Sequence, residues 1–132
     1  MAKHVVCRVE ELPPGERKIV EVHGRTIGVF NVGGRYYALL NRCPHKASPL
    51  CRGLLTGLTT SPAPYRYEVQ RQGEILRCPW HGWEFDITNG RSVFNPHRVR
   101  VRSYEVTVED EEDPSVETFP VSVEHRSVVL HV

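Results

Sequence analysis

Two short segments, each bringing one cysteine and one histidine together, constrain this chain more than any other feature of its sequence. The first is Cys43-Pro44-His45 and the second is Cys78-Pro79-Trp80-His81. Thiolate and imidazole side chains are ligands for Zn²⁺ and for iron–sulfur clusters. The proline after each cysteine fixes φ and removes one N–H, which stiffens a loop whose other amides can point at sulfur. The pattern therefore predicts a metal centre between two loops, with the candidate ligands Cys43, His45, Cys78 and His81.

Two kinds of metal centre fit these ligands. A zinc module needs only four ligands in a tetrahedron. A [2Fe–2S] cluster with two cysteines on one iron and two histidines on the other needs one thiolate and one imidazole from each loop, which both loops offer. The pattern favours one iron–sulfur cluster per chain. The zinc module stays the alternative, and the colour of the purified protein tests it.

Length and composition narrow the classes of function. The 132 residues suffice for one domain with a single core. A net charge of +1 argues against nucleic acid and against a membrane surface as partners. No run approaches the ~18 apolar residues that span a bilayer, and the N-terminus shows no export signal. We therefore expect a cytoplasmic protein, where disulfides rarely persist and metal binding better explains the four cysteines.

Both ends of the chain are patterned as short β-strands. Ten glycines and ten prolines leave little room for helices. We expect strands at 17–22, 26–32 and 35–40, the last two joined at Gly33-Gly34, because glycine tolerates φ > 0 at both central positions of a turn. Residues 98–102 alternate arginine and valine with period two, which is the pattern of a half-buried strand.

The alternation continues toward the C-terminus. Its apolar members are Tyr104, Val106 and Val108, then Val121 and Val123, which should pair with Val128 and Leu130. Residues 41–96, between the two patterned arms, are rich in Gly, Pro, Cys and His and have weak periodicity. We expect a single domain, 1–132, in which a β base of residues 1–40 and 97–132 holds a metal-binding insert, 41–96.

The insert resembles the two cluster loops of Rieske proteins. The resemblance rests on Cys43-Pro44-His45 with Pro49-Leu50 and Gly53, and on the run from Cys78 to Asp86, CPWHGWEFD, with Asn89-Gly90. It is greatest to the ferredoxins and oxygenase Rieske domains that feed aromatic-ring hydroxylation. The resemblance implies an all-β Rieske fold of three stacked antiparallel sheets. It also implies that Cys43 and Cys78 bind a buried iron, while His45 and His81 bind an outer iron at the surface.

The chain departs from the family in the length of one segment. The 32 residues between His45 and Cys78 are about twice the usual number. We expect the surplus, 55–72, to form a surface hairpin in which 65–69 pair with 74–77 across Gln72-Gly73. A flap specific for a partner is the alternative, since added loop length costs little free energy.

A second departure concerns the high-potential branch of the family. That branch has an extra cysteine in each loop and hydroxyl donors after the second histidine. Here Trp83 and Phe85 stand in place of the hydroxyls, so we expect a low reduction potential. Cys51 has no partner cysteine in the second loop, and we expect Cys51 and Cys7 to be small buried residues.

We expect an electron-transfer protein and not an enzyme. The other histidines form no recognisable His/His/carboxylate iron site, and the chain lacks a glycine-rich dinucleotide loop. The resemblance suggests a ferredoxin that carries single electrons from a reductase to a terminal oxygenase. The alternatives are a small Rieske subunit bound tightly to a larger oxidoreductase, and a redox sensor. Arg91, Arg98, Arg100 and Arg102 form either a solvated face or a docking surface for a redox partner.

Overall fold

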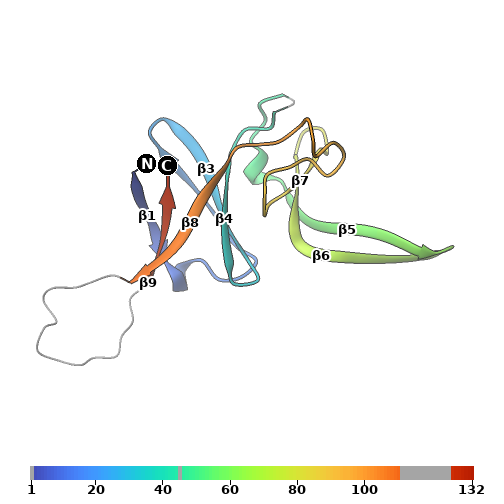
Figure 1. The fold of residues 1–132 in the computed structure, drawn as a ribbon, viewed down its shortest axis with the longest axis horizontal. Coiled ribbons are helices and arrows are strands. Elements are labelled where there is room, and N and C mark those ends of the chain that lie inside the picture. Colours follow the sequence, from blue (N-terminus) through green and yellow to red (C-terminus); the bar gives the residue numbers. More distant parts are fainter. Residues whose placement is uncertain (1, 45, 111–125) are drawn as a thin grey trace, which may run out of the picture.

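The computed structural model describes residues 2–44, 46–110 and 126–132, and its regular elements are almost all strands (Figure 1). In chain order the strands are β1 (Lys3–Arg8), β2 (Arg17–Val22), β3 (Arg25–Val32), β4 (Arg35–Leu40), β5 (Leu54–Ala63), β6 (Arg66–Arg77), β7 (Glu84–Asp86), β8 (Ser103–Asp110) and β9 (Arg126–His131). The 3₁₀ turns η1 (Val9–Glu11) and η2 (Leu50–Arg52) complete the described elements. The described chain contains no helix with the length and apolar character needed to cross a membrane.

All strand pairs are antiparallel, which confirms the all-β class. One sheet has the order β1-β9-β8-β4-β3-β2 and the other has the order β5-β6-β7. The resemblance implied three sheets, and the difference arises at one seam. There β4 and β8 pair only through Ala38 with Tyr104 and Leu39 with Ser103, so two three-stranded groups join into one six-stranded sheet. The division into base and insert stays a prediction, although the larger sheet takes its strands only from 3–40 and 103–131.

The N-terminal strands agree with the sequence pattern. β2 and β4 have the expected bounds, and β3 begins one residue earlier. Gly33 and Gly34 connect β3 to β4 with φ values of 59° and 91°. These values suit a two-residue hairpin turn that a side chain would strain, so this prediction is confirmed.

The strand expected at 98–102 is absent, and that prediction is wrong. Arg100 makes only an isolated bridge to Arg91, and β8 starts at Ser103. The N–H of Val101 instead donates to the carbonyl of Gly90 at 2.8 Å, so this segment is tied to a loop and not to a sheet. The alternation of burial survives, with Val101 buried between two exposed arginines.

The C-terminal strand has different partners from those expected. β9 pairs with both β1 and β8, which places Val128 opposite Cys7 and Val108. Val121 and Val123 lie outside the described residues. The pairing expected for them is therefore untested, and Val128 and Leu130 are fully buried by other strands.

The surplus segment forms a hairpin that projects from the body of the molecule (Figure 1). Its strands are β5 and β6, and Tyr65 at its turn is 98% exposed. The expected turn at Gln72-Gly73 is wrong, because this dipeptide lies inside β6. The register moves from Thr56 opposite Ile75 to Leu58 opposite Gln70, so residues 71–74 bulge out of the ladder. Gly73, with φ of 83°, permits the bulge.

One apolar core joins the two sheets. Phe30 and Leu39 of the larger sheet share this core with Leu76 and Phe85 of the smaller one, and the thiols Cys43 and Cys78 belong to it as well. The three-stranded sheet is therefore held against the larger sheet by buried side chains close to both cysteine loops, which fixes how those loops face each other.

Cys51 and Cys7 are buried core residues, as expected. The Cys51 side chain is fully buried, and its Sγ lies 3.4 Å from the carbonyl oxygen of Leu39. A Cβ at Gly28 would come within 2.5 Å of that sulfur, so only glycine leaves room for it. Burial raises the pKa of the Cys51 thiol from 9.0 to about 12, which keeps it protonated at neutral pH.

Candidate metal centre

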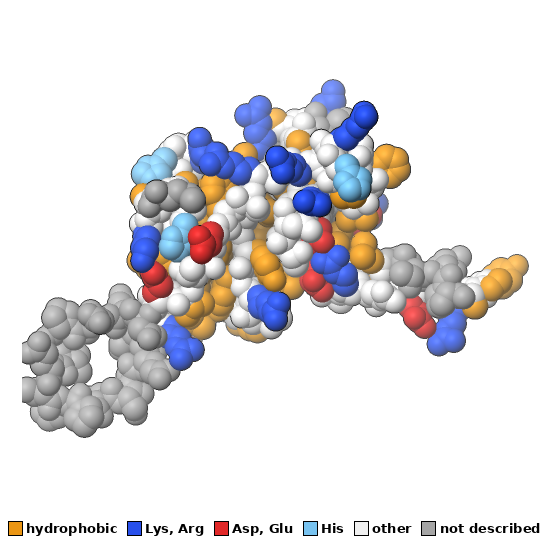
Figure 2. Space-filling model, viewed as in Figure 1, with side chains coloured by type: hydrophobic (Ala, Val, Ile, Leu, Met, Phe, Trp, Pro, Cys, Tyr) orange, Lys and Arg blue, Asp and Glu red, His pale blue; other side chains and the backbone are white. Residues whose placement is uncertain are grey.

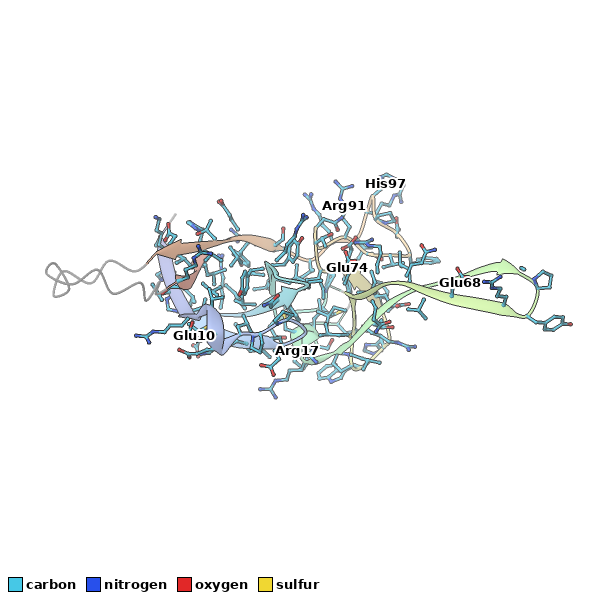
Figure 3. The ribbon with its side chains drawn as sticks, turned by 90° about the horizontal axis from the view of Figure 1, so that it is seen from below. Glu10, Arg17, Glu68, Glu74, Arg91 and His97 are labelled. Atoms are coloured by element: carbon cyan, nitrogen blue, oxygen red, sulfur yellow. The ribbon has the colours of Figure 1, made fainter. Side chains whose placement is uncertain are left out.

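The first cysteine loop folds back on itself. The N–H of Cys43 donates to the carbonyl of Ser48 at 3.0 Å, and the N–H of Ala47 donates to the carbonyl of Cys43 at 2.8 Å. Cys43 is only 1% exposed. The guanidinium of Arg17 in β2, labelled in Figure 3, donates to the carbonyls of Cys51 and Gly53, which directly follow this loop. These bonds attach the first loop to the larger sheet.

The second cysteine loop joins two paired strand ends. Arg77 of β6 lies opposite Glu84 of β7, so residues 78–83 are the connection of a β-hairpin. Within it the N–H of Cys78 donates to the carbonyl of Trp83 at 2.7 Å. The N–H of Gly82, whose φ is 73°, donates to the carbonyl of Cys78 at 3.1 Å. This closed geometry keeps Cys78 only 2% exposed.

The two loops meet at the sulfur of Cys78. The Oγ of Ser48, which is fully buried, lies 2.8 Å from this sulfur. Burial by itself raises the pKa of the Cys78 thiol, but hydrogen bonds outweigh it and the net shift is downward. The bonds come from the Ser48 hydroxyl, from the backbone N–H groups of His81 and Trp80, and from the Cys43 side chain. Such surroundings favour the thiolate, which is the form that binds metal.

The imidazole of the second loop lies on the outside. His81 is exposed, and its ring lies 6.5 Å from that of Trp80 at an interplanar angle of 73°. His45, the remaining candidate ligand, lies outside the described residues. Among the residues that are described, no three His, Cys, Asp or Glu side chains gather closely enough to hold one metal ion.

These donors fit a two-iron cluster. Two buried thiols stand next to each other, and the described imidazole is exposed on the same loop as one of them. In a Rieske centre the cysteines bind one iron and the histidines bind the other. Backbone N–H groups already directed at a cysteine sulfur are the further feature that such a site requires.

Ser48 is the site residue that sequence reasoning missed. The expectation about hydroxyl donors concerns only the positions after His81, and there Phe85 is fully buried in the core. The structure instead supplies a hydroxyl from the opposite loop. Its signal in the sequence is slight: Ser48 lies five residues after Cys43 and directly before Pro49.

The fold and this pair of loops define a class of protein. Residues 2–105 match the family model of the Rieske [2Fe–2S] domain, and the chain belongs to that family. It carries one [2Fe–2S] cluster. The predictions of the family, the fold class and the cofactor are thus confirmed, and the zinc alternative is wrong.

Its relatives include carriers and larger proteins. The chain is 27% identical over 108 residues to the ferredoxin CarAc of Metapseudomonas resinovorans, covering 81% of this chain and 86% of that one. It is 34% identical over 130 residues to the oxygenase component of chloroacetanilide N-alkylformylase from Rhizorhabdus wittichii, covering 96% of this chain and 29% of that one. It is 29% identical over 106 residues to apoptosis-inducing factor 3 of Homo sapiens. That match covers 80% of this chain and only 15% of that protein.

Solved structures support the fold. The ferredoxin of carbazole 1,9a-dioxygenase from Nocardioides aromaticivorans superimposes with a TM-score of 0.65, covering 97% of both chains at 22% identity. At this level of identity the likeness bears on the fold, which the chain shares with a Rieske ferredoxin.

Proposed function

We propose that this chain is a ferredoxin that carries single electrons from a reductase to a terminal oxygenase in the cytoplasm, with its cluster held by Cys43, His45, Cys78 and His81. The observation that carries the ligand assignment is the contact among the buried side chains of Cys43, Cys78 and Ser48, which come from the two cysteine loops. When bound, the cluster accepts and releases one electron. All four cysteines are free and buried, which suits a reducing compartment.

The residues around the cofactor have two roles, one in the core and one at the surface. Cys43 and Cys78 lie in the core, where water is excluded and N–H groups stabilise negative charge on sulfur. His81 and Trp80, which is 62% exposed, lie at the surface of the second loop. Electrons therefore enter and leave at the imidazole side of the site, where a partner can approach closely.

The known ferredoxin relatives support the choice of partners. One is the ferredoxin CarAc, and another is the ferredoxin component of a naphthalene 1,2-dioxygenase system of Pseudomonas aeruginosa. A solved complex of an oxygenase with a ferredoxin in carbazole 1,9a-dioxygenase has the same fold in its ferredoxin chain. We therefore propose that this chain meets its partners in transient encounters.

A second candidate function is a Rieske unit bound permanently to a larger oxidoreductase. It is favoured by the similarity to the oxygenase component of chloroacetanilide N-alkylformylase, which extends over 96% of this chain. Gel filtration of the reconstituted chain alone distinguishes the two. A monodisperse, red-brown monomer supports the carrier, whereas aggregation favours the bound subunit.

The proposed function is tested by reductive titration of the reconstituted protein, followed by electron paramagnetic resonance. We expect one electron per chain, reversible reduction, and a signal whose nitrogen couplings come from two histidines. Reduction by a different number of electrons, or a cluster with cysteine ligands alone, would contradict the proposal.

A further inference from the structure

Three adjoining hollows on the surface are lined by cations, and no acidic residue lines them among the described parts of the chain. One is lined by Arg91, His97, Arg98 and Arg100 together with Pro96. The next shares Arg100 with it and adds Arg42, Lys46 and Arg102. The third shares Arg42 and Arg102 with the second and continues to Arg25. We call the residues Arg42, Lys46, Arg91, Arg98, Arg100 and Arg102 the basic face.

The basic face adjoins the metal centre. Its middle hollow is lined by Cys43 and Pro44 of the first cysteine loop, beside Arg42 and Lys46. Figure 2 shows Lys and Arg side chains gathered along the upper edge of the molecule, where Figure 1 places the loops between the two sheets. In Figure 3, Arg91 and His97 lie near each other, away from the projecting hairpin that carries Glu68.

Three cations outside the basic face have carboxylate partners, namely Lys3, Arg66 and Arg71. Lys3 lies 2.7 Å from Glu109, and Arg71 lies 2.9 Å from Asp86. Arg66 on the hairpin pairs with Glu68 at 3.2 Å. Within residues 2–44, 46–110 and 126–132, no ion pair involves the basic face, and all six of its side chains are exposed.

The basic face therefore concentrates positive charge on one part of the surface, although the net charge of the whole chain is only +1. Like charges close together repel one another, so the arrangement costs stability unless a partner neutralises it. Five of the six residues are arginines, whose planar guanidinium groups bind carboxylates through two parallel hydrogen bonds. Complementary charge mainly speeds and orients encounters.

We propose that the basic face is the docking surface for a redox partner protein that presents a carboxylate-rich surface around its own flavin or iron centre. The inference rests on the proposed function. Docking there places the partner's centre against the first cysteine loop, so that one electron passes between the two centres and no covalent bond forms or breaks. A protein is favoured over nucleic acid or lipid because the face adjoins the redox site, and only a redox protein exchanges an electron there.

Small charged oxidants test the field at the cluster without any knowledge of the partner. The reduced holoprotein is mixed by stopped flow with ferricyanide, an anion, or with tris(phenanthroline)cobalt(III), a cation. At about 0.01 M ionic strength, where screening is weak, the variant Arg100→Glu/Arg102→Glu should react with ferricyanide about tenfold more slowly than the wild type. Its reaction with the cobalt complex should accelerate, and both differences should vanish in high salt.

The control is Arg66→Glu, which reverses one charge on the hairpin, against two in the double variant. At about 0.1 M ionic strength, where the screening length is about 10 Å, it should change either rate by less than about twofold, because the hairpin projects away from the body of the molecule. Cluster content and circular dichroism show that both variants are folded. Equal rates for the wild type and the double variant with both oxidants would overturn the proposal. The proposed function fails separately, if the cluster does not cycle by one electron.

Macromolecular probes then test the class of partner at about 0.15 M salt. Polyglutamate should slow ferricyanide oxidation of the wild type and leave the double variant unaffected. Micromolar binding of duplex DNA or of phosphatidylglycerol vesicles that exceeds polyglutamate binding would replace the protein partner with nucleic acid or membrane. Self-association that the double variant abolishes would assign the face to a second copy of the chain and overturn the proposal.

Discussion

The Oγ of Ser48 lies 2.8 Å from the Sγ of Cys78, although 30 residues separate them in the chain. Ser48 belongs to the first cysteine loop and Cys78 begins the second. Once the sulfur is a metal-bound thiolate, the hydroxyl is the only possible donor of the two. The contact therefore links the loops and adds a hydrogen bond to a ligand of the cluster.

We expect Ser48→Ala to lower the reduction potential. A hydrogen bond to sulfur stabilises the reduced, more negative state. A bond of about 0.5–1.5 kcal/mol corresponds to roughly 20–60 mV in a one-electron couple. A spectroelectrochemical titration measures the shift. The control is Ser92→Ala, another buried serine, whose Oγ accepts a bond from the N–H of Asn95. An unchanged potential in Ser48→Ala would show that the hydroxyl does not act on the cluster.

The wild-type potential itself should lie in the lower part of the Rieske range, below about 0 mV. Hydroxyl hydrogen bonds to the cluster raise the potential. Ser48 supplies one such hydroxyl, whereas Phe85 supplies none at the position where the high-potential branch has a hydroxyl donor. A midpoint above about +150 mV would contradict this expectation and would argue against a carrier reduced by a nicotinamide-dependent reductase.

The ligand assignment predicts which substitutions remove the cluster. Cys78→Ser and His81→Ala should give nearly colourless protein, because each removes a ligand from a site that metal binding helps to fold. Cys51→Ser should keep the colour, since its hydroxyl can still donate to the carbonyl of Leu39. Iron content and visible absorption are the measurements. A colourless but folded Cys51→Ser would mean that the thiolates are wrongly assigned.

Cys51 also predicts a change of stability with pH. In the folded chain burial raises its pKa from 9.0 to about 12. The thiol therefore stays neutral in the native state while it ionises in the unfolded state. Its contribution is present below pH 9.0 and is lost as the pH rises toward about 12, at up to about 1.4 kcal/mol per pH unit. Urea unfolding between pH 8 and 11 should show a smaller alkaline loss in Cys51→Ser, by about that slope. Equal slopes would place Cys51 in contact with water.

Gly53→Ala should disrupt the approach to the second cysteine loop. A Cβ at Gly53 would lie 1.9 Å from the carbonyl oxygen of Arg77, the residue before Cys78. Backbone must move to relieve that contact, so we expect a loss of more than about 2 kcal/mol and reduced retention of iron. In the control, Gly15→Ala, only the φ of 86° opposes the new methyl group, and nothing lies within 4 Å. Equal effects of the two variants would contradict a steric cause.

Shortening the hairpin decides whether it is a spacer or a partner-specific flap. Replacing residues 59–69 with Asn-Gly keeps the pair of Leu58 and Gln70 and removes the exposed end of the arm. Loop length costs little free energy, so the melting temperature and the potential should stay nearly unchanged. Slower transfer to the physiological partner in this variant would identify a flap, and an unchanged rate would identify a tolerated surface hairpin.

Features that depend on neighbours along the chain can be predicted from the sequence alone. The two cysteine loops are such features, because ligands two or three residues apart must share one loop. The turn at Gly33-Gly34 is another, since its positive φ values are available to glycine without any contact from elsewhere in the fold. The burial of Val101 between arginines also followed from alternation, although the strand itself did not form.

Features that depend on contacts between distant segments follow from the tertiary fold and could not be predicted in this way. The Gln72-Gly73 signal became a bulge because Ile75 is already paired with both Thr56 and Asp86. Two sheets became one because β4 and β8 meet across two pairs of residues. A shared core packs the two sheets against each other. Only this packing brings Ser48 to Cys78 and places Arg42 and Arg100 in the lining of one hollow. Periodicity along the chain carries no information about such meetings, since their geometry is set by packing between segments and not by spacing within them.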